Sequence, residues 1–125
     1  MLFWLFCLCM DLLLPAAMLL LGWCFLTRPP KTINGLYGYR TARSMKNQST
    51  WDFAHRTCGR LWFQLGLILM PMSIIAMMSV LGREAGTVGL WCAAVALIQT
   101  AVLVCSIFPV ERALKRHFDD FGRKR

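Results

Sequence analysis

The amino-acid sequence predicts an all-α membrane protein with three transmembrane helices. Apolar residues make up 58% of the 125 residues, whereas soluble domains contain about 45–50%. The charged residues are also confined to short segments between long uncharged runs, although soluble helices normally distribute charge along one face. A single membrane domain covering residues 1–125 is therefore expected.

The first predicted span covers residues 1–27, and Asp11 is its only ionisable side chain. Such a helix is about 40 Å long at a rise of 1.5 Å per residue, which is enough to cross a bilayer at a tilt. The apolar core of a signal peptide is shorter, about 7–15 residues, and follows a basic segment. Because no Lys or Arg precedes this run, we predict a retained transmembrane helix.

The second and third spans are predicted over residues 61–81 and 87–108, which carry no charge. Residues 82–86 form a connection so short that these two spans must be antiparallel neighbours. Small residues recur every fourth position at Ala85, Gly89 and Ala93. This spacing is typical of close helix packing in membranes, although it also arises by chance in an Ala-rich helix.

Two polar segments flank these spans, a loop over residues 28–60 and a tail over 109–125. Within the loop, Ser49 followed by Asp52 fits a capping box. An amphipathic interfacial helix is therefore expected to begin there, before the second span. The tail alternates charged and apolar residues and is expected to form a helix on the membrane surface.

The basic residues predict the orientation of the chain. Seven Lys or Arg lie in the loop and six in the tail, whereas the connection between the second and third spans holds Arg83 alone. Because cytoplasmic segments carry the excess of Lys and Arg, we predict an outside N-terminus and a cytoplasmic C-terminus in a plasma membrane. Anionic lipid headgroups are the expected partners of this charge. Direct nucleic-acid binding is not expected, because no recognition chemistry accompanies the net charge of +8.

No cofactor, metal site or catalytic constellation is predicted. Five of the six cysteines lie in apolar runs, where they behave as small apolar residues. His55 and Cys58 are three residues apart, but two ligands are too few for a zinc site. No nucleophile–base pair or phosphate-binding glycine loop is present, so the chain is expected not to be an enzyme.

One candidate polar site lies inside the membrane. An ionisable residue within a span is a functional hypothesis by default, because a mid-membrane charge is unfavourable by about 2.5–3.5 kcal/mol on insertion scales. Asp11 is expected to face Gln64, Ser73 or Gln99 across the bundle. The alternative is that the span begins later and leaves Asp11 near the outer headgroups, or that Asp11 is protonated.

The loop holds the second candidate site, in which aromatic, cationic and small polar residues alternate beside the membrane. Physically, Arg40 could be fixed by Asn34 and Thr41 and present a cation to a lipid phosphate or an acidic partner. A plain cytoplasmic loop with interfacial aromatic anchors is the alternative. The candidate binding residues are Asn34, Tyr37, Gly38, Arg40, Thr41, Ser44 and Trp51.

The same residues, with Ala54 in the following helix, resemble the SdpI family of small bacterial membrane proteins over roughly residues 25–110. The resemblance implies immunity to a secreted toxic peptide and signalling by recruitment of a cytoplasmic repressor protein to the membrane. A small membrane enzyme or transporter acting on a lipid or small solute is the alternative, with Asp11 and Arg40 lining its site. A third reading is a structural subunit or homo-oligomer, since three short spans bury little surface alone.

Overall fold

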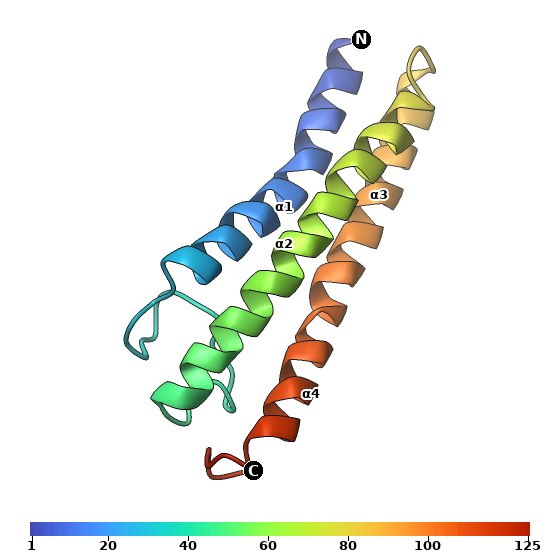
Figure 1. The fold of residues 1–125 in the computed structure, drawn as a ribbon. Coiled ribbons are helices and arrows are strands. Elements are labelled where there is room, and N and C mark those ends of the chain that lie inside the picture. Colours follow the sequence, from blue (N-terminus) through green and yellow to red (C-terminus); the bar gives the residue numbers. More distant parts are fainter.

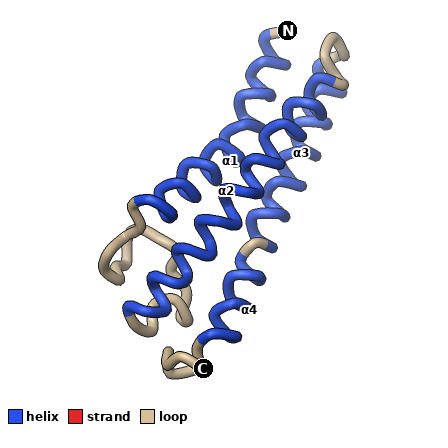
Figure 2. Tube along the Cα trace, viewed as in Figure 1, coloured by secondary structure: helices blue, strands red, loops and turns tan.

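The computed structural model describes residues 1–125 as four helices joined by irregular segments (Figures 1 and 2). The helices are α1 (Leu2–Thr27), α2 (Gln48–Met78), α3 (Ala85–Cys105) and α4 (Ile107–His117). The chain runs along α1, returns along α2, and reverses again into α3 and α4. The N-terminus and the α2–α3 connection therefore share one end of the bundle, which we call the hairpin end. The long segment 28–47 and the C-terminus share the other end, which we call the loop end.

The predicted fold class is confirmed. Three helical stretches are long and apolar enough to cross a bilayer: Leu2–Thr27, Gln48–Met78 and Ala85–His117. Their outward faces are apolar, as on α3, where Leu90 and Leu97 are 76% and 71% exposed. A soluble monomer rarely exposes so much contiguous apolar surface, but a helix surrounded by lipid does. The chain is a multi-pass membrane protein.

Helices α1 and α2 pack closely through glycines. A Cβ built on Gly22 would lie 2.7 Å from the Phe63 nitrogen and 2.8 Å from the Gly59 carbonyl oxygen. A Cβ on Gly66 would lie 2.7 Å from Cγ of Leu19. Any side chain at these positions would push the backbones apart, which is the reason for glycine in tightly packed membrane helices. The small-residue pattern predicted for the third span serves no such contact, because Ala85 and Ala93 are exposed.

The start of α2 differs from the prediction. The interfacial turns and the second span form one continuous helix, and its cap is Asn47 rather than Ser49. The Asn47 side chain accepts a hydrogen bond from the Thr50 backbone N–H at 2.9 Å, and the Thr50 hydroxyl accepts one from the Asn47 N–H at 3.0 Å. Asp52 accepts a bond from the Gln48 side chain instead of completing a cap. Asparagine is as good a cap as serine, so the sequence pattern alone did not separate them.

Helix α4 continues the direction of α3 after a break at Ser106. The indole nitrogen of Trp62 in α2 donates to the Ser106 hydroxyl at 3.0 Å, which fixes the break against the bundle. The apolar face of α4 buries Val110 and Leu114 against the first turns of α2. Its opposite face is basic, so the tail contains the predicted amphipathic helix. The helix differs from the prediction because it extends the direction of α3 and ends at His117 instead of covering the whole tail.

Candidate functional site

Segment 28–47 has no regular secondary structure, yet hydrogen bonds fold it onto the first turns of α2. We call it the loop platform. It begins with a turn at Asn34, whose side-chain oxygen accepts hydrogen bonds from the N–H groups of Leu36 and Tyr37 at 2.9 and 2.7 Å. The side chain of Asn34 also donates to the Thr32 carbonyl. An asparagine that bonds its own backbone in this way closes a turn without help from the rest of the protein.

The loop platform packs on His55 of α2, which is fully buried. Its Nε2 accepts a hydrogen bond from the Tyr39 backbone N–H at 2.8 Å. Its Nδ1 lies 2.8 Å from the Trp51 carbonyl oxygen, which can only accept. These two partners require the neutral ring with its proton on Nδ1. The histidine therefore works as a buried acceptor for the loop rather than as a free base or metal ligand.

Gly38 makes the hydrogen bond between Tyr39 and His55 possible. Its φ of +118° lies in a region that side chains rarely adopt. A Cβ at this position would also lie 2.5 Å from His55 Nε2 and 3.2 Å from Pro30 Cγ. Glycine is therefore required twice, for the backbone conformation and for the close approach to the imidazole.

Thr41 and Ser44 close the second turn of the loop platform. The Thr41 N–H donates to the Ser44 hydroxyl oxygen at 2.8 Å, and the Ser44 N–H donates to the Thr41 hydroxyl at 3.2 Å. The Ser44 hydroxyl also donates to the Tyr39 carbonyl at 2.9 Å. The Thr50 hydroxyl then bonds the Ser44 carbonyl at 3.0 Å, which joins this turn to the cap of α2. Ser44 is completely buried, so its contacts within the loop serve structure rather than direct ligand contact.

Trp51 holds the other end of the segment. Its indole nitrogen donates to the Pro30 carbonyl at 2.7 Å, and its ring packs on His55 with 4.3 Å between centroids. The ring is fully buried, so Trp51 is not one of the interfacial aromatic anchors of the alternative interpretation of the loop. Tyr37 is the exposed aromatic of the loop, and its ring edge meets Phe25 of α1.

The loop platform is also joined to α4 and to the segment after it. The Tyr39 hydroxyl donates to a carboxylate oxygen of Glu111 in α4 at 2.7 Å. Burial, followed by this contact with Glu111, raises the pKa of the Tyr39 hydroxyl, so it stays protonated and able to donate. The Asn47 side chain donates to the Gly122 carbonyl at 2.7 Å. Elements far apart in the sequence therefore form one folded unit at the loop end.

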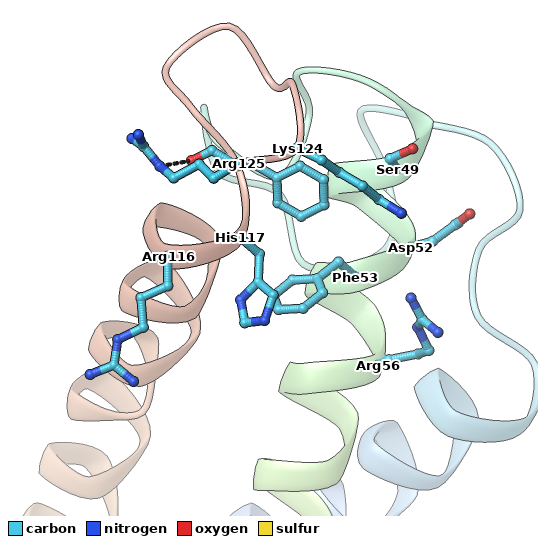
Figure 3. Close-up of a pocket in the computed structure, with 9 residues that line it drawn as sticks. Ser49, Asp52, Phe53, Arg56, Arg116, His117, Lys124 and Arg125 are labelled. Atoms are coloured by element: carbon cyan, nitrogen blue, oxygen red, sulfur yellow. Dashed lines mark hydrogen bonds between the residues drawn. The ribbon is translucent and has the colours of Figure 1, made fainter.

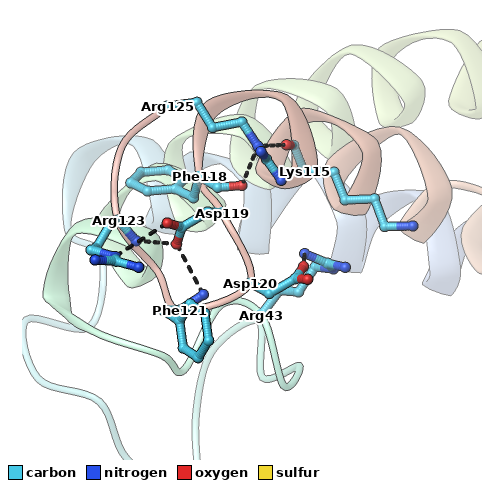
Figure 4. A network of polar contacts seen from close by, with 8 residues as sticks. All are labelled: Arg43, Lys115, Phe118, Asp119, Asp120, Phe121, Arg123 and Arg125. Atoms are coloured by element: carbon cyan, nitrogen blue, oxygen red, sulfur yellow. Dashed lines mark hydrogen bonds and ion pairs between the residues drawn. The ribbon is translucent and has the colours of Figure 1, made fainter.

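Residues 118–125 fold back on the end of α4, and we call them the hook (Figure 4). A side-chain oxygen of Asp119 accepts hydrogen bonds from the N–H groups of Phe121 and Arg123 at 2.9 and 2.8 Å. These hydrogen bonds lower the pKa of Asp119, and the bond from the Arg123 backbone N–H has the largest effect. Asp120 lies 3.5 Å from a guanidinium nitrogen of Arg43, so an ion pair connects the hook to the loop platform.

Arg40 differs from its predicted role. Its guanidinium donates to the Gly35 carbonyl, and neither Asn34 nor Thr41 fixes it. Both of those side chains are used in their own turns. Arg40 remains exposed, so it presents a cation on the outer surface of the loop platform.

Two of the three residues named as the intramembrane candidate, Asp11 and Gln99, meet inside the bundle, together with Ser73. The Gln99 side-chain nitrogen donates to the Asp11 backbone carbonyl and to the Ser73 hydroxyl, both at 2.6 Å. The Cys92 thiol lies 3.5 Å from Oδ1 of the Asp11 carboxyl group. These four side chains form what we call the polar cluster, which joins α1, α2 and α3. Gln64 is exposed and lies outside it.

Asp11 faces the interior of the bundle and is only 1% exposed, so its carboxyl group does not lie on the outer surface of the bundle. Its second carboxyl oxygen has no hydrogen-bond partner. A buried acceptor without a partner is unfavourable, and such groups concentrate at strained or functional positions. Asp11 is therefore the least satisfied polar group of the bundle interior.

The polar cluster gives a test of how the third helix is held. Replacing Gln99 by leucine removes two inter-helix hydrogen bonds, each worth about 0.6 kcal/mol on average in membrane proteins. We expect a loss of about 1–2 kcal/mol of unfolding free energy, measured by denaturant titration in micelles. Thr100→Val is the matched control, because Thr100 is exposed and bonds only its own helix. Equal stability of the two variants would contradict a structural role for the cluster.

The loop platform and the two helices after it coincide with a known sequence family. A family model described as the SdpI/YfhL protein family matches residues 31–110. The chain belongs to this family. It is also 45% identical over 47 residues to the uncharacterized protein YfhL of Bacillus subtilis strain 168, a match that covers 38% of this chain and 43% of that protein. No solved structure matches the chain.

Six of the seven motif residues named from the sequence lie within the loop platform, and Trp51 lies beside it on α2. The matched SdpI/YfhL region contains all of them. Sequence reasoning missed the residues that organise the motif, His55, Asn47 and Thr50. His55 was considered as a metal ligand and was otherwise placed on the polar face of the helix. No group of three His, Cys, Asp or Glu side chains is arranged to hold a metal ion. The position of His55 could have indicated its role, because it follows Trp51 by four residues and so lies on the same face of α2.

Proposed function

We propose that this SdpI/YfhL protein is a non-enzymatic membrane protein that confers immunity to a secreted toxic peptide, signals by recruiting a cytoplasmic partner, or does both. The observation that supports this most is the loop platform itself. Its buried residues, Tyr39 and Ser44, are held by hydrogen bonds. Arg40 and Tyr37 remain exposed on its surface. A surface ordered in advance binds a partner without the entropy loss of folding a flexible loop.

The distribution of cavities favours this role over an enzyme or a transporter. Either of those would need a cavity joining Asp11 to the Arg40 surface. The groove nearest the polar cluster is lined by Ser73 and Gln99 between α2 and α3, and it holds about 120 Å³. The larger polar cavities lie at the loop end and include neither Asp11 nor Arg40. A packed bundle with an exposed basic end fits a protein that acts through its surface.

We further propose that the loop end is cytoplasmic and that the protein resides in the plasma membrane of a bacterium. All basic side chains except Arg83 belong to the loop end, which favours the cytoplasmic side. Alkaline phosphatase fused after Arg125 is expected to be inactive, whereas the enzyme inserted at Gly82 is expected to be active. Green fluorescent protein at the same two positions should give the opposite pattern. The reverse result for both reporters would contradict the orientation.

The immunity role predicts protection of sensitive cells. Cells that express the wild-type protein are expected to survive a killing peptide that is encoded beside its gene. If no neighbouring gene encodes such a peptide, the killing peptide of the SdpI system is used instead. Gly35→Ala should protect equally, because a Cβ at Gly35 meets nothing within 4 Å. The Gly38→Ala protein should not protect the cells, even when it is present in the membrane at the same level as the wild-type protein. Survival that is no better than that of cells without the protein would contradict immunity.

A further inference from the structure

A polar cavity of about 400 Å³ lies at the loop end, between the first two turns of α2 and the hook (Figure 3). We call it the basic groove. Ser49, Asp52 and Arg56 line it from α2, and Lys124 extends toward them from the hook. His117 forms part of its floor with its ring against Phe53, at 4.7 Å between centroids. None of these residues belongs to the loop motif.

The basic groove has an excess of positive charge. Its lining contains Arg56, Arg116, Lys124 and Arg125, against a single carboxylate, Asp52. The two ion pairs of the protein are Arg43–Asp120 and Arg123–Asp119, so neither uses a cation of the groove. The hook's own carboxylates are therefore engaged elsewhere. An anion that enters the groove would meet cations that have no partner in an ion pair.

The groove is held in shape by the same contacts that order the hook. Arg125 donates through Nε to the carbonyls of Lys115 and Phe118 at 2.8 and 3.0 Å, which leaves its terminal nitrogens free. Phe118 is buried, and Gly122 turns the chain with a φ of +81°. The hook then returns beside the end of α4, and the backbones of Phe118 and Lys124 form an isolated antiparallel β-bridge. Lys124 therefore projects from a folded segment rather than from a free tail.

Two neighbouring cavities extend this surface and indicate the ligand. One shares Asp52 and Arg56 and adds Lys31, with a volume of about 450 Å³. The other lies on the outer side of α4, where Arg112 and Arg116 adjoin Phe108, which is 64% exposed. Cations next to an exposed apolar surface match a ligand with a charged head and an apolar tail. Free phosphate would use the first feature only.

We propose that the basic groove binds the phosphate group of an anionic lipid headgroup, with Arg56 and Lys124 as its principal cations. Phosphate oxygens accept charge-assisted hydrogen bonds from Arg and Lys, and Ser49 adds a hydroxyl donor. The groove belongs to the basic surface of the loop end, and clusters of Lys and Arg beside membrane spans attract anionic headgroups. This site is separate from the loop platform and does not depend on the immunity role.

The test measures binding of short-chain lipids to the full chain in a neutral detergent, by native mass spectrometry and by thermal unfolding. Dioctanoyl phosphatidic acid and dioctanoyl phosphatidylglycerol are the anionic probes, dioctanoyl phosphatidylcholine is the zwitterionic probe, and inorganic phosphate is the free anion. We expect the anionic lipids to bind wild-type protein most tightly. The double variant Arg56→Gln/Lys124→Gln should weaken this binding about tenfold or more, since two charge-assisted contacts are lost.

Arg60→Gln is the matched control, because Arg60 is an exposed cation one turn further along α2 and lines neither cavity that contains Arg56. It should bind the anionic lipids as wild-type protein does. Because Arg56 and Lys124 are both exposed, the double variant should unfold at the wild-type temperature without lipid. Equal weakening in Arg60→Gln, or no weakening in the double variant, would overturn the site. Inorganic phosphate binding as tightly as the lipids would overturn the lipid as ligand.

Discussion

Gly38→Ala is expected to detach the loop platform from α2. The backbone strain of a side chain at a φ of +118° is about 1–3 kcal/mol. The new methyl group would also overlap His55 Nε2, because the two atoms would be 2.5 Å apart. Moving the loop outward relieves the overlap but breaks the Tyr39–His55 hydrogen bond, which leaves a buried acceptor without a partner. The strained and the detached states are both less stable than the wild-type loop.

Limited proteolysis of the reconstituted protein measures this effect. Gly38→Ala should be cut between residues 31 and 46 at least ten times faster than wild-type protein, since a loss of about 1.4 kcal/mol is tenfold in the population of an opened loop. Gly35→Ala is the matched control from the same loop and should be cut at the wild-type rate. A Gly38→Ala loop as resistant as the wild type would mean that His55 does not hold this segment.

Gly22→Ala is expected to loosen the packing of α1 on α2. Its Cβ would lie 2.7 Å from the Phe63 nitrogen and 2.8 Å from the Gly59 carbonyl oxygen, both of which are backbone atoms. Backbone atoms cannot rotate away as a side chain does, so the helices must separate. Forcing an extra methyl group into a well-packed interface is unfavourable by about 1–3 kcal/mol. The separation would also weaken the neighbouring contact at Gly59, which faces Phe25.

Thermal unfolding in micelles, followed by tryptophan fluorescence, measures the effect of Gly22→Ala. The midpoint should fall by several degrees, since about 1 kcal/mol corresponds to roughly 4–8 °C in a domain of about this size. Gly86→Ala is the control, because a Cβ at Gly86 in the first turn of α3 meets nothing within 4 Å. It should be neutral or slightly stabilising, since alanine favours helix more than glycine does. Equal midpoints for the two variants would contradict the close approach of α1 and α2.

The helices were predictable because each is encoded locally. Three long apolar runs predicted three spans, and the brief connection around Arg83 predicted the antiparallel pair α2–α3. The periodic charges after Glu111 likewise predicted the amphipathic helix α4. Which small residues meet was not predictable in the same way. The pattern at Ala85, Gly89 and Ala93 was the more regular one, yet the contact forms at Gly22 and Gly59, whose meeting depends on the register of two different helices.

The loop motif was recognised as a set of residues, but its geometry was not. An irregular segment has no period from which to infer the direction of a side chain. The positions of Tyr39 and Asn47 also depended on partners far along the chain. Tyr39 bonds Glu111, which is 72 residues away, and Asn47 bonds Gly122, which is 75 residues away. The polar cluster was easier, because Asp11 and Gln99 are conspicuous in apolar helices and a buried polar group requires a partner.

The central claim is that segment 28–47 is a folded platform rather than a flexible connection between two spans. Hydrogen–deuterium exchange of the wild-type protein in lipid nanodiscs tests it at the Tyr39, Thr41 and Ser44 amides, which bond His55 and one another. We predict exchange at least tenfold slower than the intrinsic rate at all three, with protection lost at Tyr39 in Gly38→Ala. Exchange at the intrinsic rate across the segment in wild-type protein would contradict the claim.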